Sequence, residues 1–394
     1  MESTIAKGQQ YIMNTYTRFP IAFARGEGVW LYDEDGKRYL DFTAGIAVNS
    51  LGHGHPALSG AIAKQAADLI HCSNLYWTKP QVTLAEKLVR NSCFEKVFFC
   101  NSGAEAIEAA LKLIRKYGNQ KGQNKNEIIT MENSFHGRTY GAVTATGQSK
   151  YQKDLHPLLP GIRHVPFNDF EALAASITEH TGGILIEPIQ GEGGIRPADK
   201  EFLQKVRKLC DDKDILLIFD EVQCGVGRTG YLFAYEYYGV TPDAVAIAKG
   251  IAGGVPMGML LTNAKTCDTF GPGDHASTFG GNPLATAAAN VVVDQLLGGL
   301  LDHVKAMGAY LNQKLLQLQQ KAPVITAVRG AGLIQGIELS IPGADIIQKC
   351  IDKGLLLVGS GSHVIRFVPP LIVTESDIDS AIEILGEAIN EVTA

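Results

Sequence analysis

The sequence predicts an α/β fold: a mostly parallel central sheet with helices on both faces. Two observations carry this prediction. Short, continuously apolar runs recur along the chain, and amphipathic helical patterns separate them. Strands covered on both faces are apolar throughout, and parallel strands need helical crossovers between them. The 394 residues suffice for two cores, so a smaller α+β domain is expected beside the large one.

The predicted elements follow in order from the N-terminus. GVWLYDEDGKRYLDF (28–42) contains two β-type runs around an Asp-Gly turn, which is typical of a hairpin. Helical spacing of apolar residues follows in 57–71 and 81–91. The strands expected after these helices are KVFFC (96–100), EIITM (127–131), RHVPF, GGILIEP (182–188), ILLIFDE (215–221), AVAIAK and MGMLLT.

A domain boundary is expected near residue 285. Beyond it, the composition shifts to long helices and a few strands such as LIQGIEL and VIRFVPP. We expect residues 51–285 to form the large domain and residues 286–394 the small one. The N-terminal segment, residues 1–50, is expected to join the small domain.

Composition excludes several classes of partner. The chain has 35 basic and 41 acidic residues, a net charge of −6, and no dense basic stripe, which argues against a nucleic-acid partner. Seven scattered cysteines without a C-x-x-C pair are typical of a reduced intracellular chain, and GHGHP (52–56) lacks a third metal ligand. The N-terminus has no secretory apolar region, and Gly253, Gly254 and Pro256 interrupt the most apolar stretch. We therefore expect a cytoplasmic protein without a metal, and no membrane contact.

Lys249 follows an apolar run, AVAIA, and precedes a Gly-rich stretch. One interpretation is a lysine that extends from a strand end into solvent. The other is an amine in a dry pocket, where desolvation lowers its pKa and frees a nucleophilic lone pair. This stretch alone does not decide between the exposed and the buried lysine. The residues at the other strand ends are needed to choose.

Ligands of open α/β sheets bind beyond the carboxyl ends of the strands. NSGAEA (101–106) leads from a strand into a helix and is either a phosphate site or an ordinary helix cap. SFHGRT places Phe135, His136 and Arg138 at another strand end, where they suit a flat ring and a carboxylate unless the segment is a surface loop. Asp220 ends an apolar strand and faces either a cation or a helix terminus.

One motif is misleading. GVGRTG (225–230) matches a dinucleotide fingerprint, but Asp220 and Glu221 precede it and aromatic residues follow it, so the required strand–turn–helix context is missing. The remaining features are a phosphate cradle, an aromatic plate, a carboxylate for a ring nitrogen and a buried lysine. Together they favour pyridoxal phosphate, with Lys249 as the Schiff-base residue.

These motifs, with GIAVNSLGHGHP, EPIQGEGG, AKGIAGGVPMG and STFGGNPLA, resemble the class III aminotransferases of the fold-type I pyridoxal 5'-phosphate group. Within that family the chain is most similar to the acetylornithine aminotransferases. The resemblance extends from about residue 11 to the C-terminus.

The resemblance implies roles for individual residues. Lys249 would bond the cofactor and move the proton, and Asp220 would pair with the pyridinium nitrogen. The other expected cofactor-binding residues are Ser102, Gly103, Ala104, Phe135, Val222, Gln223 and Thr278. The expected substrate-binding residues are Arg138, Ser277, Glu192 and Arg366, with Glu192 as the partner of Arg366. Ala104 stands where related sequences often carry Thr, so one hydroxyl contact to the phosphate is missing.

The resemblance also implies an activity: transfer of an amino group from N2-acetyl-L-ornithine to 2-oxoglutarate, giving glutamate, in arginine biosynthesis. The loop HASTFGGNP (275–283) is distant in sequence from NSGAEA, and the family implies that Thr278 reaches the partner's site in a homodimer with shared active sites. Ornithine, succinylornithine, succinyldiaminopimelate and 4-aminobutyrate aminotransferases stay open as alternatives. So do an aminomutase or decarboxylase on the same fold, and a binding protein without catalysis.

Overall fold

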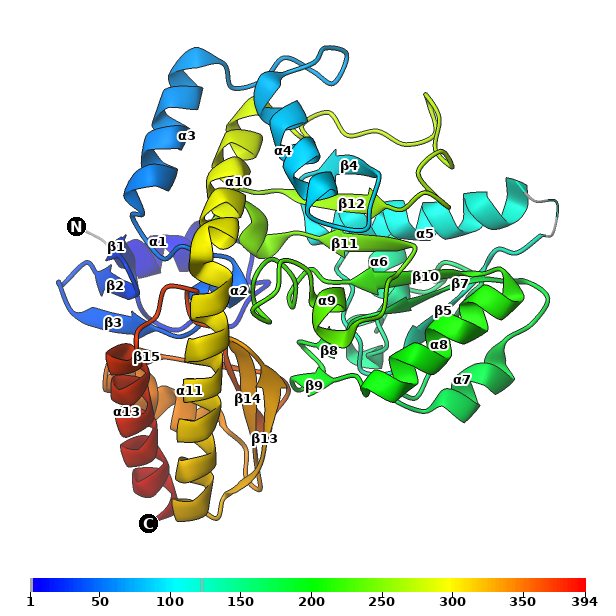
Figure 1. The fold of residues 1–394 in the computed structure, drawn as a ribbon. Helices are drawn as coiled ribbons and strands as arrows, with labels where there is room; N and C mark the ends of the chain where they lie inside the picture. Colours follow the sequence, from blue (N-terminus) through cyan, green and yellow to red (C-terminus); the bar gives the residue numbers. More distant parts are fainter. Residues whose placement is uncertain (1–2, 121, 123) are drawn as a thin grey trace.

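The computed structural model describes residues 3–120, 122 and 124–394. Within these residues, seven strands form a central sheet (Figure 1). In spatial order they are β4 (Lys96–Cys100), β12 (Gly258–Thr262), β11 (Ala244–Ile247), β10 (Leu216–Asp220), β7 (Thr181–Ile186), β5 (Glu127–Met131) and β6 (Ile162–Val165). Strand β12 is antiparallel to both of its neighbours, and the other neighbouring pairs are parallel. This confirms the predicted mostly parallel sheet.

Both faces of the sheet are buried, which explains why its strands are apolar at successive positions. Ile218 packs on one face with helix α5 (Gly103–Gln120), whereas Leu217 and Phe219 enter the larger core on the other face. Other helices near this sheet are α6 (Tyr140–Ala145), α7 (Phe170–Ser176), α8 (Lys200–Lys213) and α9 (Ala234–Tyr238). Successive side chains of a strand point to opposite faces of the sheet. Here both faces are covered by apolar layers, so no polar face results.

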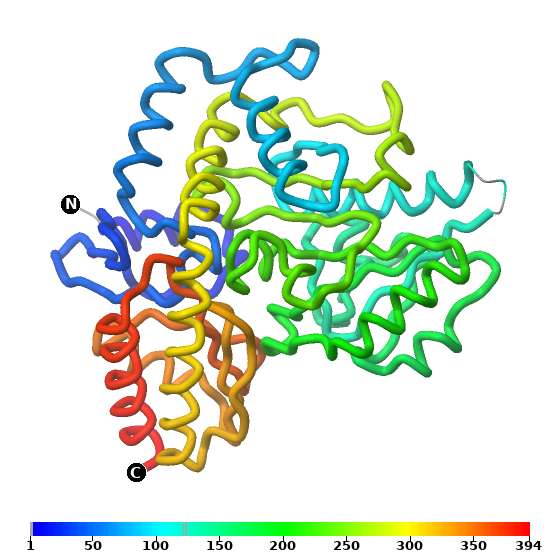
Figure 2. Tube along the Cα trace, viewed as in Figure 1, coloured from blue at the N-terminus to red at the C-terminus, as the bar shows by residue number. Residues whose placement is uncertain are grey.

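The N-terminal hairpin pairs with a segment near the other end of the chain. Strands β1 (Phe23–Glu27), β2 (Trp30–Asp33) and β3 (Arg38–Asp41) form an antiparallel set, and β15 (Leu355–Leu356) adds to β3 in parallel. In Figures 1 and 2 the blue N-terminal strands accordingly lie beside the orange and red C-terminal part. The domain boundaries proposed from composition stay predictions.

A second sheet lies in the C-terminal part of the chain. Its order is β13 (Ile325–Ala331), β14 (Ile334–Leu339), β17 (Val364–Phe367) and β16 (Val358–Gly359), and all its pairs are antiparallel. Helices α12 (Ala344–Asp352) and α13 (Glu375–Thr393) pack on each other here. The remaining elements are α1 (Thr4–Tyr11), the 3₁₀ turns η1 (Ser149–Tyr151) and η2 (Lys249–Ala252), and the short pair β8 (Ile189–Gln190) and β9 (Arg196–Pro197).

One continuous helix links the central sheet to the C-terminal part. It comprises α10 (Pro283–Gln295), the π-helical turn η3 (Leu296–Leu300) and α11 (Leu301–Lys321), and is the long yellow element in Figure 1. It contains a stretch that is apolar enough to cross a membrane by length and composition only, a test that core helices also pass. Here α10 packs against α3 (Pro56–Asp68) and α4 (Lys79–Arg90), and its buried apolar residues include Ala288, Val292 and Val293.

A left-handed turn follows the N-terminal hairpin. The backbone φ angles of Ala44, Gly45, Ile46 and Ala47 are 47°, 65°, 65° and 62°, although the segment is assigned as helix α2 (Ala44–Ala47). This conformation costs an L-residue roughly 1–2 kcal/mol. It therefore needs support from the surrounding structure.

Asp41 supplies that support from a fully buried position. Its Oδ1 accepts hydrogen bonds from the N–H and Oγ1 of Thr43 and the N–H of Ala44, at 2.7–2.9 Å. Its Oδ2 accepts one from His53 Nε2 at 2.8 Å. Burial alone would raise the pKa of Asp41, but the hydrogen bonds from His53, Thr43 and Ala44 hold it below its ordinary value of 3.8.

We expect Asp41→Asn to lower the free energy of unfolding by about 3 kcal/mol at neutral pH, because a carboxamide cannot accept at both ends and hydrogen bonds to a buried charge contribute about 1.5–3 kcal/mol. A folded pKa below the unfolded one stabilises the fold fully above pH 3.8. That stabilisation is lost as the pH falls through the folded pKa. Urea unfolding of wild type and variant across this range should show a gap that shrinks in acid. Asp33→Asn is the control, because the half-buried Asp33 also accepts two backbone N–H groups. An equal loss in both variants would contradict the special role of Asp41.

Candidate active site

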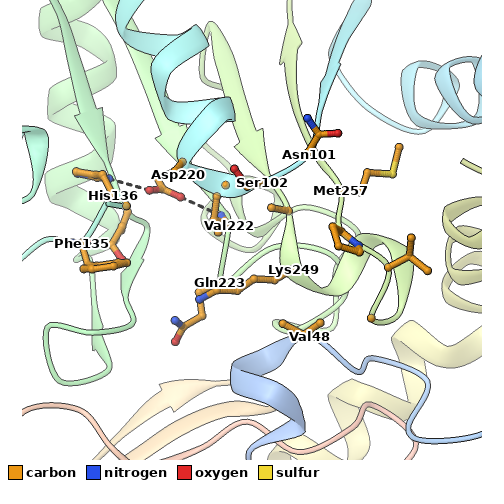
Figure 3. A pocket seen from close by; sticks show the side chains of 18 residues that line it. Val48, Asn101, Ser102, Phe135, His136, Asp220, Val222, Gln223, Lys249 and Met257 are labelled. Carbon is orange, nitrogen blue, oxygen red and sulfur yellow. Dashed lines mark hydrogen bonds and ion pairs between the residues drawn. The ribbon is translucent and has the colours of Figure 1, made fainter. Parts of the chain in front are cut away.

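A cavity of about 360 Å³ opens at the carboxyl ends of the central strands. The neighbouring strands β11, β10, β7 and β5 lead directly or through a short turn to Lys249, Asp220, Glu187 and Phe135. Figure 3 shows these and other lining residues. The lining consists of Val48, Asn101, Ser102, Gly103, Ala104, Phe135, His136, Gly137, Glu187, Asp220, Val222, Gln223, Ala248, Lys249, Gly254, Val255, Pro256 and Met257.

Lys249 points into this cavity rather than out from the protein surface (Figure 3). Burial lowers the pKa of its amine to about 8, against the opposing effect of Glu192. An appreciable fraction of the amine is therefore neutral near physiological pH. Its backbone has a φ of 47°, a strained conformation for a residue with a side chain. Of the two sequence interpretations, the structure supports the buried amine.

The segment 101–104 forms the start of α5. Ser102 Oγ accepts the N–H of Glu105 at 3.2 Å and so caps the helix. The N–H groups of Gly103 and Ala104 lie in the first turn, where an α-helix supplies no partner of its own. A Cβ at Gly103 would come within 2.7 Å of Val222 Cγ1, so the close approach of this turn to Val222 requires glycine. The arrangement suits an anion at the helix N-terminus.

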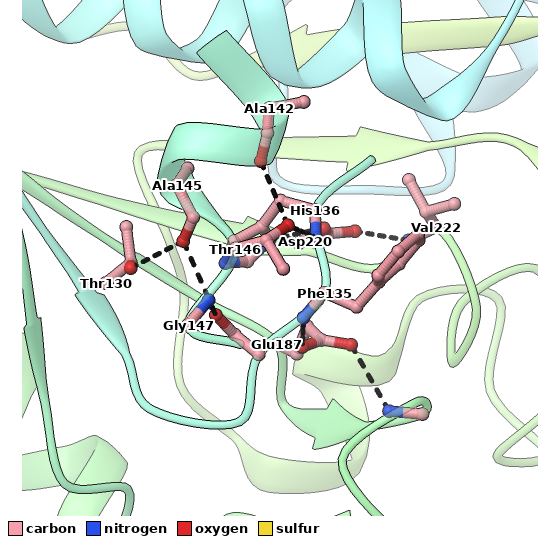
Figure 4. Close-up of polar contacts among 12 residues, drawn as sticks. Thr130, Phe135, His136, Ala142, Ala145, Thr146, Gly147, Glu187, Asp220 and Val222 are labelled. Atoms are coloured by element: carbon pink, nitrogen blue, oxygen red, sulfur yellow. Dashed lines mark hydrogen bonds and ion pairs between the residues drawn. The ribbon is translucent and has the colours of Figure 1, made fainter. Parts of the chain in front are cut away.

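Asp220 is held from two sides at the end of β10. Its Oδ2 accepts a hydrogen bond from Nδ1 of the buried His136 at 2.7 Å, and its Oδ1 accepts the N–H of Val222 at 3.0 Å (Figures 3 and 4). His136 is itself anchored, because its N–H donates to Thr146 Oγ1 at 2.9 Å. A fixed carboxylate in this position can pair with a protonated ring nitrogen.

Phe135 and Val222 provide apolar surfaces on the cavity wall. The ring of Phe135 lies edge-on to Tyr151, with centroids 5.4 Å apart. The guanidinium of the exposed Arg138 lies over Tyr151 at 4.1 Å and near Phe135 at 5.6 Å. Arg138 is therefore beside the cavity rather than part of its lining, and its charge is accessible to an incoming carboxylate.

The structure also brings Arg366 and Glu192 together. The guanidinium of Arg366, on β17, donates to Glu192 Oε1 at 2.5 Å and to Gln223 Oε1 at 2.8 Å. Gln223 Nε2 donates to the same Glu192 oxygen at 3.3 Å. Burial alone would raise the pKa of Glu192, but Arg366 holds it below its usual value. The pair is electrically neutral at pH 7.

The loop with Ser277 and Thr278 lies closer to its own chain's site than its distance in sequence suggests. Ser277 Oγ accepts a hydrogen bond from Nδ2 of Asn101 at 3.1 Å, and Asn101 lines the cavity. The loop is distant from the NSGAEA turn in sequence but contacts it in the fold. Neither Ser277 nor Thr278 lines the cavity of its own chain.

Sequence reasoning missed several lining residues, notably Val48 and Glu187. Glu187 directly follows β7, so the rule that singled out Asp220 could have found it. Val48 follows the left-handed turn, which the sequence did not predict. His53 and His55, considered as possible metal ligands, instead bind Asp41 and cap α3. Among the described residues, no group of three or more His, Cys, Asp or Glu side chains could hold a metal ion.

The cavity fits pyridoxal phosphate. It combines an N–H cradle at Gly103 and Ala104, apolar flanks at Phe135 and Val222, the carboxylate of Asp220 and the amine of Lys249.

Comparison with known proteins agrees with this site. The class III aminotransferase family matches residues 11–389. The chain is 52% identical to the acetylornithine aminotransferase of Caldanaerobacter subterraneus subsp. tengcongensis, over 98% of each protein. Its structure is similar to that of the N-acetylornithine aminotransferase from Stenotrophomonas maltophilia K279a, with a TM-score of 0.86, 36% identity and 99% of each chain covered.

A structure of the ornithine aminotransferase from Toxoplasma gondii, described with partial occupancy of pyridoxal phosphate at its active site, is also similar. Its TM-score is 0.93 at 31% identity, covering 98% of this chain and 94% of that one. The family match, the near full-length identity and the site geometry agree. The chain therefore belongs to the class III aminotransferases and is a pyridoxal-phosphate-dependent transaminase.

Proposed function

We propose that the protein transfers the terminal amino group of N2-acetyl-L-ornithine to 2-oxoglutarate, giving glutamate, as a cytoplasmic step of arginine biosynthesis. The observation that carries the proposal is the near full-length identity of about half to acetylornithine aminotransferases. Backbone similarity to an ornithine aminotransferase is as high as to an N-acetylornithine aminotransferase, so the fold alone does not choose the donor. The higher sequence identity favours the acetylated one.

The residues of the cavity divide the work of holding the cofactor. The first turn of α5, with Ser102, Gly103 and Ala104, would bind the phosphate. Phe135 and Val222 would flank the ring, Asp220 would pair with its nitrogen, and Gln223 would lie near its hydroxyl. When bound, pyridoxal phosphate supplies a carbonyl carbon that accepts the amino group and a protonated ring that withdraws electrons.

Lys249 has two tasks. Its neutral amine would be the group that bonds the cofactor, and it would hold and move the proton at the reacting carbon of the substrate. A pKa of about 8 suits both, because the amine can exist in either protonation state near neutral pH. Asp220, oriented by His136, would pair with the ring nitrogen of the cofactor.

The two substrates differ in the number of carboxylates that they present. Arg138 would hold the one that they share. Arg366 would hold the second carboxylate of glutamate or 2-oxoglutarate. While acetylornithine is bound, Glu192 neutralises Arg366, and the geometry of the pair supports this role. Ser277 would lie near the acetylated end of the donor.

The protein is proposed to act as a homodimer with shared sites. The segment 69–77 exposes Leu75 and Trp77 at 84% and 89%, and the neighbouring Phe279 at 61%. His71, in the same segment, is in ring contact with Phe279, so the segment and the loop that carries Phe279 lie side by side. Such an exposed apolar surface favours a protein interface. A second copy seated on it would leave Thr278 free to bind the partner's cofactor phosphate.

A panel of amino donors tests the proposed function. With 2-oxoglutarate as acceptor, we expect kcat/KM for N2-acetyl-L-ornithine to exceed that for ornithine by about tenfold or more, because acylation removes a charge that the site would otherwise have to desolvate. N2-succinyl-L-ornithine, succinyldiaminopimelate and 4-aminobutyrate complete the panel. Lys249→Ala should be inactive with every donor. A higher kcat/KM for any of the other donors would overturn the proposed substrate.

Removal of Glu192 tests the use of Arg366. We expect Glu192→Ala to leave Arg366 free to hold the carboxylate of acetylornithine in the wrong register. The ratio of the glutamate to the acetylornithine half-reaction rate constant should then rise about tenfold, as single-turnover kinetics would show. Equal losses in both half-reactions would mean that Glu192 is only structural.

Subunit complementation tests the shared site. Lys249→Ala and Thr278→Ala homodimers should both be impaired, the second through weaker cofactor binding. In a mixed dimer, the subunit that retains Lys249 would receive an intact Thr278 from its partner. Activity at limiting cofactor should therefore exceed that of either parent. With subunit exchange verified, activity equal to the average of the parents would show that Thr278 acts within its own chain.

A further inference from the structure

Glu187 is a carboxyl group in the cavity that none of the roles above uses. It directly follows β7, between the strands that lead to Asp220 and to Phe135, and it is only 5% exposed. Among the residues that the structure describes, no Lys, Arg or His forms an ion pair with it, in contrast to Asp220 and Glu192. A buried carboxyl without a cation needs a different explanation.

Its two oxygens bind two different walls of the cavity. Oε2 accepts the N–H of Phe135 at 2.9 Å, and Oε1 accepts the N–H of Gly191 at 3.2 Å. Figure 4 shows Glu187 beside Phe135. The segment with Phe135 and His136 on one side of the cavity is called the aromatic wall below. Gly191, bound by the other oxygen, immediately precedes Glu192. Residues 191–194 are called the gate loop below.

The gate loop packs against Gln223, which binds the side chain of Arg366. A side chain at Gly191 would collide with Oε1 of Gln223, so the backbone here lies directly against that carboxamide. Gln223 in turn contacts both Arg366 and Glu192. A shift of Gly191 would therefore displace Arg366 and Glu192, the two side chains proposed to distinguish a substrate with one carboxylate from a substrate with two.

The opposite side of the gate loop is also fixed. Ser360 Oγ donates to the carbonyl of Gly191 at 2.8 Å and accepts the N–H of Gly194 at 2.8 Å. The backbone of Gly191 is thus held through both its N–H and its carbonyl group. Glu187 differs from Ser360 because it also binds the aromatic wall.

We infer that Glu187 is a positioning residue that fixes the aromatic wall and the gate loop relative to each other, through its bonds to Phe135 and Gly191. The inference deepens the proposed function, since it assigns the backbone support of the Glu192–Arg366 gate. The carboxyl group of Glu187 thereby aligns Phe135, which would cover the cofactor ring, with Glu192 and Arg366, which would select the carboxylates of the substrate.

The electrostatics of Glu187 agree with this geometry. Burial raises its pKa well above the usual value, and the neighbouring charge of Asp220 adds to the effect. The hydrogen bonds from the N–H groups of Phe135 and Gly191 lower the pKa and so oppose this effect, without reversing it. Glu187→Gln keeps the volume of the side chain but replaces one of its two acceptor oxygens with an NH₂ donor.

Backbone hydrogen exchange tests the coupling directly. The protein carries Glu187→Gln or Glu187→Ala, and exchange is measured in peptides covering 132–137 and 189–194. A peptide from β10 reports global unfolding. Two controls loosen one wall each. Thr146→Val removes the acceptor for the N–H of His136, beside Phe135, and Ser360→Ala removes the support on the far side of the gate loop.

We expect Glu187→Ala to accelerate exchange about tenfold in both peptides relative to the β10 peptide, since each loses a hydrogen bond worth about that factor. Thr146→Val should affect only the first peptide and Ser360→Ala only the second. Glu187→Gln should accelerate at least one of them. Should the alanine variant fail to fold, the glutamine variant decides alone. Wild-type exchange in both peptides, or acceleration of only one by Glu187→Ala, would overturn the inference.

Kinetics supply a second readout. Glu187→Ala should slow both half-reactions and also change their ratio. Ser360→Ala should change mainly the ratio, and Thr146→Val mainly the common rate. A uniform loss in Glu187→Ala, with an unchanged ratio, would contradict a role at the gate. Hydrogen exchange is measured without substrate, so it tests Glu187 whichever amine the donor panel identifies.

Discussion

The direction of the parallel strands is the constraint on which the site depends. Because β11, β10, β7 and β5 run the same way and lie side by side, the residues that follow them meet at one edge. The lysine, the two carboxyl groups and the aromatic side chain need no further device to come together. Helix α5 begins at the same edge, so its N-terminus faces the same space. The order and direction of the strands therefore determine which residues form the site.

Bringing these groups together creates an electrostatic problem, because the cavity concentrates charges away from water. Each charged group is either paired with an opposite charge or shifted towards its neutral form. Arg366 pairs with Glu192, and His136 pairs with Asp220. For the two groups without such a partner, burial favours the neutral form: it lowers the pKa of Lys249 and raises that of Glu187. A neutral amine is also what a nucleophile requires, so desolvation serves the chemistry as well as the fold.

Prediction from sequence succeeded where a signal is local. Asp220 and Lys249 each end an apolar run, and such runs identify strand ends without knowledge of the fold. Glu192 and Arg366 lie 174 residues apart, and only the family resemblance linked them. The antiparallel direction of β12 leaves no trace in its apolar pattern, which a parallel strand would share. Val48 depends on a left-handed turn that Asp41 and His53 stabilise, and neither is adjacent to it in sequence.

The pairing of β3 with β15 has a consequence for how the chain matures. Leu40 pairs with Leu355, so the N-terminal sheet stays incomplete until nearly the whole chain has been synthesised. At about 5–20 residues per second, the roughly 300 intervening residues take about 15 to 60 s on the ribosome. During that time the strand that leads into Asp41 has an open edge. The left-handed turn at residues 44–47 follows β3 directly and contacts η2, so it is among the last parts of the molecule to gain its native neighbours.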